Sequence, residues 1–184
     1  MLGMMMQRPL LISEILQFAA ETFPDGEIVS VRTEGDLHRQ SYPQTARRVA
    51  RLANALKAKG VSPGDRIATL AWNGYRHFEL YYAISGMGAV CHTINPRLSA
   101  EQLIYIVNHA EDRMLFVDTT FVPILNAVKD HLPKGMTYVI MTDRAHMPEN
   151  ALGALCYEDL LDDQPDSFGW PEFDDTTAAA LCYT

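Results

Sequence analysis

Apolar strand-like runs alternate with helical segments along most of the chain, and this alternation limits the possible folds more than any other feature. The expected strands are RIATLAW (66–72), AVCHTI (89–94), MLFV (114–117) and TYVIM (137–141). Strands separated by helices are parallel and joined by right-handed crossovers, and continuous apolarity indicates that both sheet faces are covered. We therefore predict an α/β fold, a doubly wound and mostly parallel sheet with helices on both faces, preceded by a small β-hairpin over 27–42.

Paired residues at two expected helix starts form capping boxes, in which each side chain satisfies a free backbone N–H group of the first turn. The pairs are Ser41 with Gln44 and Ser99 with Gln102, and each precedes apolar residues at helical spacing. Gly60 follows the first of these segments, where glycine readily ends a helix. We expect one helix between Ser41 and Gly60 and another after Ser99.

Three further helices are expected from periodicity with weaker start signals. Ser13 is the expected N-cap of a helix over 13–22, and Asn73 is the expected N-cap of a helix over 74–88. The second of these is apolar on most sides and should lie buried between layers; the third covers 121–132. The expected core residues are Val49, Leu52, Leu56, Ile67, Leu70, Ile84, Val90, Ile106, Leu115, Val117, Leu125 and Ile140.

The regular pattern stops after residue 142. Residues 143–177 contain three prolines and many acidic residues, and only YEDLLDD (157–163) is typical of a helix. Such a long connection usually wraps a surface or contacts another part of a larger protein. Residues 178–184 (AAALCYT) form another apolar run, typical of a buried strand. The chain is therefore divided into a regular α/β part over 13–142, an irregular connection and a final strand.

The charge balance is acidic, with a formal net charge of −8. A nucleic-acid surface needs clustered Lys and Arg, so this balance argues against nucleic acid as a partner. Arg47, Arg48 and Arg51 do cluster within one expected helix. We interpret them as a solvated helix face, with contact to an anion as the less favoured alternative.

Cysteine usage and the N-terminal segment bear on localisation. Cys91 and Cys182 lie in apolar strand-like runs and are expected to be buried free thiols, and no two cysteines have metal-ligand spacing. A reducing, cytoplasmic location fits this usage best. The first residues lack the features of a signal peptide, and no apolar run is long enough for a transmembrane helix.

Few residues carry an obvious chemical signature. His77, His92 and His109 lack zinc-ligand spacing, and no catalytic triad or carboxylate pair is evident from the spacing of residues. Asn95 and Arg97 follow an expected parallel strand, at the edge where α/β proteins bind ligands. Ordinary turn chemistry explains the same residues, so both interpretations stay open. The residues alone indicate an α/β domain without a complete active site.

Three longer segments, GVSPGDRIATLAWN, ELYYAISGMGAVCHTINPRLSAEQLIYIVNHAEDRMLFVD and TTAAALCYT, resemble the N-terminal part of AMP-forming acyl-CoA synthetases. In their sequence pattern these segments are most similar to the bacterial medium- and long-chain fatty-acid–CoA ligases. The resemblance implies that residues 1–184 are an incomplete N-terminal domain of such a ligase. It implies an enzyme that activates a fatty acid with ATP to an acyl-adenylate and transfers the acyl group to coenzyme A.

The resemblance also implies where cofactors bind. In this family a Ser/Thr/Gly-rich phosphate-binding loop follows the strand that ends in CYT, so no catalytic residue is expected in this chain and the chain alone should be inactive. Thr184 matches a threonine associated with Mg²⁺. Asn95, Pro96 and the segment from Asp118 to Phe121 match positions on the coenzyme A side.

Two alternatives remain. One is a ligase of the same superfamily that acts on another acid, such as an aryl or amino acid. The other is a non-catalytic dimerisation domain. The resemblance to dimeric ligases favours a homodimer, and an exposed edge at strand 178–184 together with the Met-rich start favours self-association. Peripheral contact with a membrane is compatible with the sequence.

Overall fold

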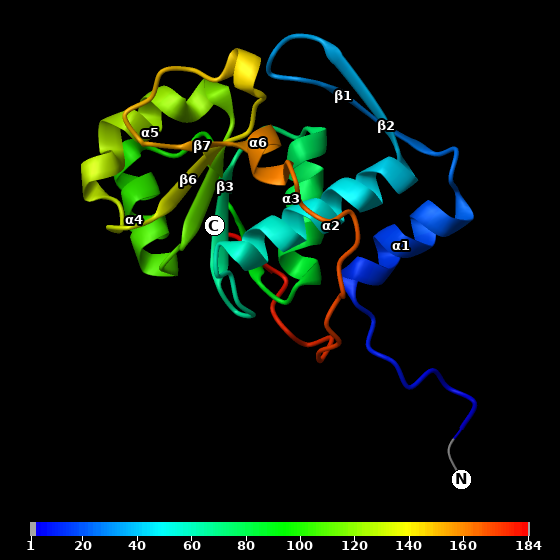
Figure 1. Ribbon diagram of the computed structural model, residues 1–184. Coiled ribbons are helices and arrows are strands. Elements are labelled where there is room, and N and C mark those ends of the chain that lie inside the picture. The colour runs from blue at the N-terminus through cyan, green and yellow to red at the C-terminus, as the bar shows by residue number, and fades with distance from the viewer. Residues whose placement is uncertain (1–2, 184) are drawn as a thin grey trace.

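Figure 1 shows the computed structural model, which describes residues 3–183. Its centre is a parallel six-stranded sheet with the strand order β7-β6-β5-β3-β4-β8. The strands are β3 (Arg66–Leu70), β4 (Val90–Thr93), β5 (Met114–Val117), β6 (Thr137–Ile140), β7 (Leu155–Cys156) and β8 (Ala180–Leu181). A separate antiparallel hairpin is formed by β1 (Glu27–Val31) and β2 (Leu37–Ser41).

Helices cover both faces of the sheet (Figure 1). The helices are α1 (Ile12–Thr22), α2 (Tyr42–Ala58), α3 (Tyr75–Gly86), α4 (Ala100–Ala110), α5 (Val122–Val128) and α6 (Tyr157–Leu161). One buried apolar cluster joins the sheet to α2, α3 and α6, and a second joins it to α4 and α5. Every residue of the predicted core is buried. The predicted doubly wound α/β fold is confirmed.

The helix starts predicted from capping boxes, and the helix end predicted from Gly60, are confirmed. Both capping boxes form: Ser41 Oγ accepts from the backbone N of Gln44, and Ser99 Oγ accepts from the backbone N of Gln102. Gly60 has φ of +80°, the left-handed conformation that ends α2.

Two single-residue N-cap predictions were wrong. The cap of α1 is Leu11, and Ser13 is buried inside the helix against Gly86 of α3, where a small side chain is needed for close packing. The cap of α3 is Gly74, because a tight turn with a hydrogen bond from Gly74 N to Trp72 O places Asn73 before the helix.

The segment expected as one helix over 121–132 has three parts. A 3₁₀ turn (Thr119–Phe121) leads into α5, and a second 3₁₀ turn (Lys129–His131) ends it. Leu125 and Val128 are buried as expected, whereas Phe121 and Ile124 are only partly buried.

The final strand is not buried as its apolar composition suggested, whereas the exposed edge predicted for residues 178–184 is present. β8 pairs only with β4, so it lies at the edge of the sheet. Ala180 is exposed, and the thiol of Cys182 is exposed while that of Cys91 is buried. An apolar composition alone does not distinguish a central strand from an edge strand.

The connection before β8 contains regular structure and contacts the helical layer. It includes a 3₁₀ turn (Arg144–His146), β7 and α6. Phe168 and Trp170 then pack against the α2–α3 side of the core, and Trp170 lies so close to Gly86 that a side chain there would overlap its ring. None of the helices in the described part of the chain is sufficiently long and apolar to span a membrane.

Candidate functional site

The order of strands singles out one position at the carboxyl edge of the sheet. The chain passes from β3 to β4 on one side and then crosses back to place β5 on the other side of β3. Ligands of open α/β sheets bind where the direction of winding reverses in this way, beyond the carboxyl ends of the strands. The residues after β3 and β5 are therefore the first candidates for a binding site.

Trp72 and Asp118 connect these two strand ends. Oδ2 of Asp118 accepts a hydrogen bond from the backbone N of Trp72 over 2.6 Å. Burial of Asp118 raises the pKa of its carboxyl to about 6, and the hydrogen bond from Trp72 and the charge of Arg76 reduce this effect. Asp118 thus holds two loops together and points inward, not toward solvent.

An aromatic surface lies beside this link. Trp72 is 49% exposed, and its ring centroid is 5.0 Å from that of Phe121 at an interplanar angle of 45°. Exposed aromatic faces of this kind can stack on a flat ring of a ligand. Trp72 had been predicted inside a buried strand; the strand instead ends at Leu70, which leaves the indole at the edge.

Asn95 and Pro96 follow β4, as predicted. Asn95 is exposed, and its Oδ1 accepts from the backbone N of Arg97 over 3.0 Å, so this side chain forms a local turn. This turn explains the positions of Asn95 and Pro96 without a ligand. Thr184 lies outside the described residues.

A network of buried charges lies next to this edge. Arg76 of α3 donates to Oε1 of Glu34 at the hairpin turn, to Oε1 of Glu158 in α6, and to the carbonyl of Met141 after β6. Burial disfavours the charged form of Glu158, but the nearby Arg48 and Arg76 outweigh this effect and lower its pKa.

Arg48 extends the network into α2. It donates to both carboxylate oxygens of Glu79 and to both of Glu158. Tyr157 and Gln40 also donate to Glu79, which is fully buried. The prediction that Arg48 belongs to a solvated helix face was wrong, because this side chain is directed into a polar interior; Arg47 and Arg51 are exposed as predicted.

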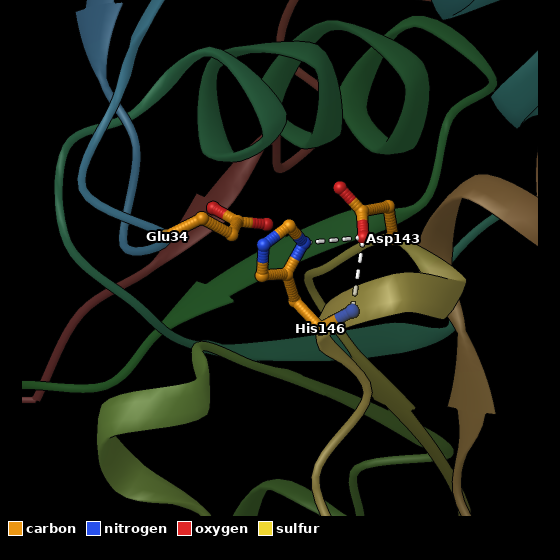
Figure 2. Close-up of side chains that lie close together, drawn as sticks. All are labelled: Glu34, Asp143 and His146. Carbon is orange, nitrogen blue, oxygen red and sulfur yellow. Dashed lines mark hydrogen bonds and ion pairs between the residues drawn. The ribbon is translucent and has the colours of Figure 1, made fainter.

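Glu34, Asp143 and His146 form a smaller cluster at the hairpin turn. Figure 2 shows the Glu34 carboxylate directed toward the His146 ring, whose Nδ1 lies 2.6 Å from Oδ1 of Asp143. Three ligand atoms are close enough for a metal ion. However, Glu34 is paired with Arg76 and Asp143 with Arg32, and these cations oppose a metal ion. The arrangement fits an ion-pair cluster that fastens the hairpin.

The three central histidines each have a separate partner. His77 Nε2 lies 3.0 Å from Oγ1 of Thr69, and His109 Nδ1 lies 2.7 Å from the Tyr183 hydroxyl. The buried His92 Nδ1 lies 2.7 Å from Oδ2 of Asp112. Burial raises the pKa of Asp112, and the contact with His92 limits that rise.

Sequence reasoning missed Trp72 and the buried charge network. A Trp directly after an apolar parallel strand was the available signal for the first. The network had no local signal, because its hydrogen-bonded partners are separated by as many as 110 residues.

The chain belongs to the AMP-binding enzyme family, whose model matches residues 16–184. It is 48% identical over its full length to a 3-methylmercaptopropionyl-CoA ligase of Ruegeria lacuscaerulensis and 45% identical to a medium-chain-fatty-acid–CoA ligase of Ectopseudomonas oleovorans. It covers 34% of each of these relatives, so it spans about a third of their length. The predicted resemblance to the N-terminal part of acyl-CoA ligases is confirmed.

Solved structures show the same fold. An anthranilate–CoA ligase superposes with a TM-score of 0.81 at 20% identity, over 97% of this chain and 33% of that one. The N-terminal domain of FACL13 from Mycobacterium tuberculosis superposes with a TM-score of 0.78 at 22% identity, over 95% of this chain and 42% of that one.

Proposed function

We propose that this chain is the N-terminal part of a ligase that activates a medium- or long-chain fatty acid with ATP to acyl-AMP and transfers it to coenzyme A. The observation that carries the proposal is the identity of 41–45% with medium- and long-chain-fatty-acid–CoA ligases over 98–100% of this chain. A carboxylate oxygen of the acid would attack the α-phosphorus of ATP and release pyrophosphate, so that this oxygen becomes part of a good leaving group, AMP. The coenzyme A thiol would then lose its proton, attack the acyl carbon and release AMP.

A second candidate substrate is 3-methylmercaptopropionate. Two relatives named as 3-methylmercaptopropionyl-CoA ligases are 48% and 44% identical to this chain. The two candidates differ in the length and polarity of the acid but use the same adenylation chemistry.

Coenzyme A is proposed to lie against Asn95, Pro96 and the segment Asp118–Phe121. The exposed Trp72 ring beside the partly buried Phe121 supports this placement, because an adenine ring can stack on an exposed indole. Asp118 would act indirectly by holding the Trp72 backbone in place.

ATP and Mg²⁺ are proposed as cofactors of the complete ligase, with Thr184 on the metal side. Adenylation needs donors placed around the phosphates where charge develops. The described part of this chain does not contain a glycine-rich phosphate loop, so we propose that residues 1–184 alone are inactive.

Self-association is proposed as well. The exposed outer side of α1 carries Ile15 and Phe18, and Phe23 packs edge-on against Phe18. Exposed apolar patches favour contacts between chains. Sedimentation velocity that resolves only a monomer at every concentration would argue against this proposal.

The substrate proposal is tested with the complete ligase encoded by the reading frame that contains this chain. Acyl-CoA formation is measured with octanoate, hexadecanoate, 3-methylmercaptopropionate and benzoate, and kcat/KM is compared. The proposal expects the fatty acids to have the highest values. Preference for 3-methylmercaptopropionate would establish the second candidate, and preference for benzoate would contradict both.

A further inference from the structure

A basic groove lies between β2 and α2. It encloses about 280 Å³ and is lined by four arginines, one histidine and two glutamines. None of the lining residues is acidic, although acidic residues outnumber Lys and Arg by 23 to 15 in the chain. A groove of one charge sign concentrates ions of the opposite sign.

Two arginines of the groove carry a positive charge that no acidic side chain of the described residues neutralises. Arg47 and Arg51 are exposed and form no ion pair within the described residues 3–183. They are one helical turn apart on α2, so their guanidinium groups project on the same side. Like charges at this spacing weaken a helix slightly, and a bound anion would remove that cost.

The other cations of the groove are already compensated. Arg48 is held by Glu79 and Glu158, and Arg39 donates to Oε2 of Glu27 over 2.9 Å. Arg48 therefore provides a fixed base for the groove without adding net charge.

Gln44 adds a donor to the same side of α2. Its Oε1 accepts from the backbone N of Ser41 in the capping box, which orients the side chain and leaves its amide N–H groups to donate. Gln44 lies three residues before Arg47, so the amide and the two guanidinium groups follow one helical stripe.

We propose that this groove binds a phosphate monoester through Arg47 and Arg51, with Gln44 as an additional donor. A phosphate monoester has close to two negative charges and three acceptor oxygens, which matches two guanidinium groups and an amide better than a carboxylate does. The same group occurs on soluble metabolites and on the headgroup of phosphatidic acid, so the test separates these two sources.

The test compares the chain with two double variants that lose the same charge. Arg47→Gln with Arg51→Gln removes the free cations of the groove, and glutamine preserves helix propensity. Lys59→Gln with Lys134→Gln removes two exposed cations outside the groove and serves as the control. Circular dichroism checks that each variant is folded.

Binding of glycerol 3-phosphate is measured by calorimetry at constant ionic strength, and binding of phosphatidylcholine vesicles with and without phosphatidic acid by co-sedimentation. We expect the groove variant to bind about a hundredfold more weakly, since each of the two lost charged hydrogen bonds contributes about a factor of ten. The control should bind like the unmodified chain. Binding of glycerol 3-phosphate would indicate a soluble ligand, and binding only of phosphatidic acid vesicles would indicate a membrane.

Three results would overturn the proposal. The first is no binding of either probe by the unmodified chain. The second is binding that the groove variant retains. The third is an equal loss of binding in both double variants, which would show that binding depends on the net charge of the chain and not on a specific site.

Discussion

Arg76 and Glu158 are 82 residues apart in the chain, yet Nε of Arg76 donates to Oε1 of Glu158 over 2.8 Å. The same guanidinium binds Glu34 at the hairpin turn. This one side chain therefore ties α3 to α6 and to the hairpin, and it orders the region beside the carboxyl edge of the sheet.

Arg76→Ala should destabilise the fold strongly. Removal of the guanidinium leaves the largely buried Glu34 and Glu158 without one of their cations, and breaking a buried pair in this way costs about 3–5 kcal/mol. Urea titration measures the change. Arg144→Ala, which removes a mostly exposed ion pair with Asp159, is the control and should change stability little. Equal effects of the two substitutions would show that burial of the network does not matter.

Asp118 should make stability depend on pH. Its pKa in the folded chain is about 6, above the ordinary value of 3.8. Between these values the folded state binds more protons than the unfolded state, so this group's contribution to stability falls as pH rises from about 4 to about 6. Asp118→Asn keeps an oxygen that can accept from Trp72 N but cannot ionise.

The free energy of unfolding of Asp118→Asn, relative to that of the unmodified chain, should therefore rise by up to about 3 kcal/mol between about pH 4 and about pH 7. Denaturant titrations of both proteins at several pH values measure this difference. A constant difference across the range would mean that Asp118 titrates normally.

Trp72→Ala in the complete ligase should raise the KM for coenzyme A by about tenfold, because stacking on an aromatic side chain contributes about 1–3 kcal/mol per base. The KM for ATP should change little. Phe23→Ala removes another exposed aromatic ring, distant in the chain from this edge, and is the control. An unchanged KM for coenzyme A in the Trp72 variant would remove the aromatic pair from the binding site.

Sequence reasoning was most accurate where the deciding interactions are local. The Ser41–Gln44 and Ser99–Gln102 boxes involve residues three apart, and both form. The burial of Leu52 followed from helical spacing. Ser13 shows the limit, because packing against Gly86 overrode its preference for a helix start.

Long-range contacts explain what was missed. In the sequence, Arg48 lies on the expected solvated face of its helix. Only the tertiary fold brings Glu79 and Glu158 into contact with it. Cys182 lies in an apolar run but is exposed, because it follows β8, an edge strand with one neighbour instead of two. Asp118 was selected by resemblance, and its inward hydrogen bond to Trp72 depends on the order of strands.

The most direct test of the proposed function compares residues 1–184 with the complete ligase. Both are incubated with ATP, Mg²⁺, coenzyme A and a series of fatty acids, and pyrophosphate and acyl-CoA are measured. We expect acid-dependent release of pyrophosphate and formation of acyl-CoA by the complete ligase, and neither above a heat-treated control by residues 1–184 alone. Failure of the complete ligase to form acyl-CoA from any acid, or activity of the 184-residue chain by itself, would contradict the account.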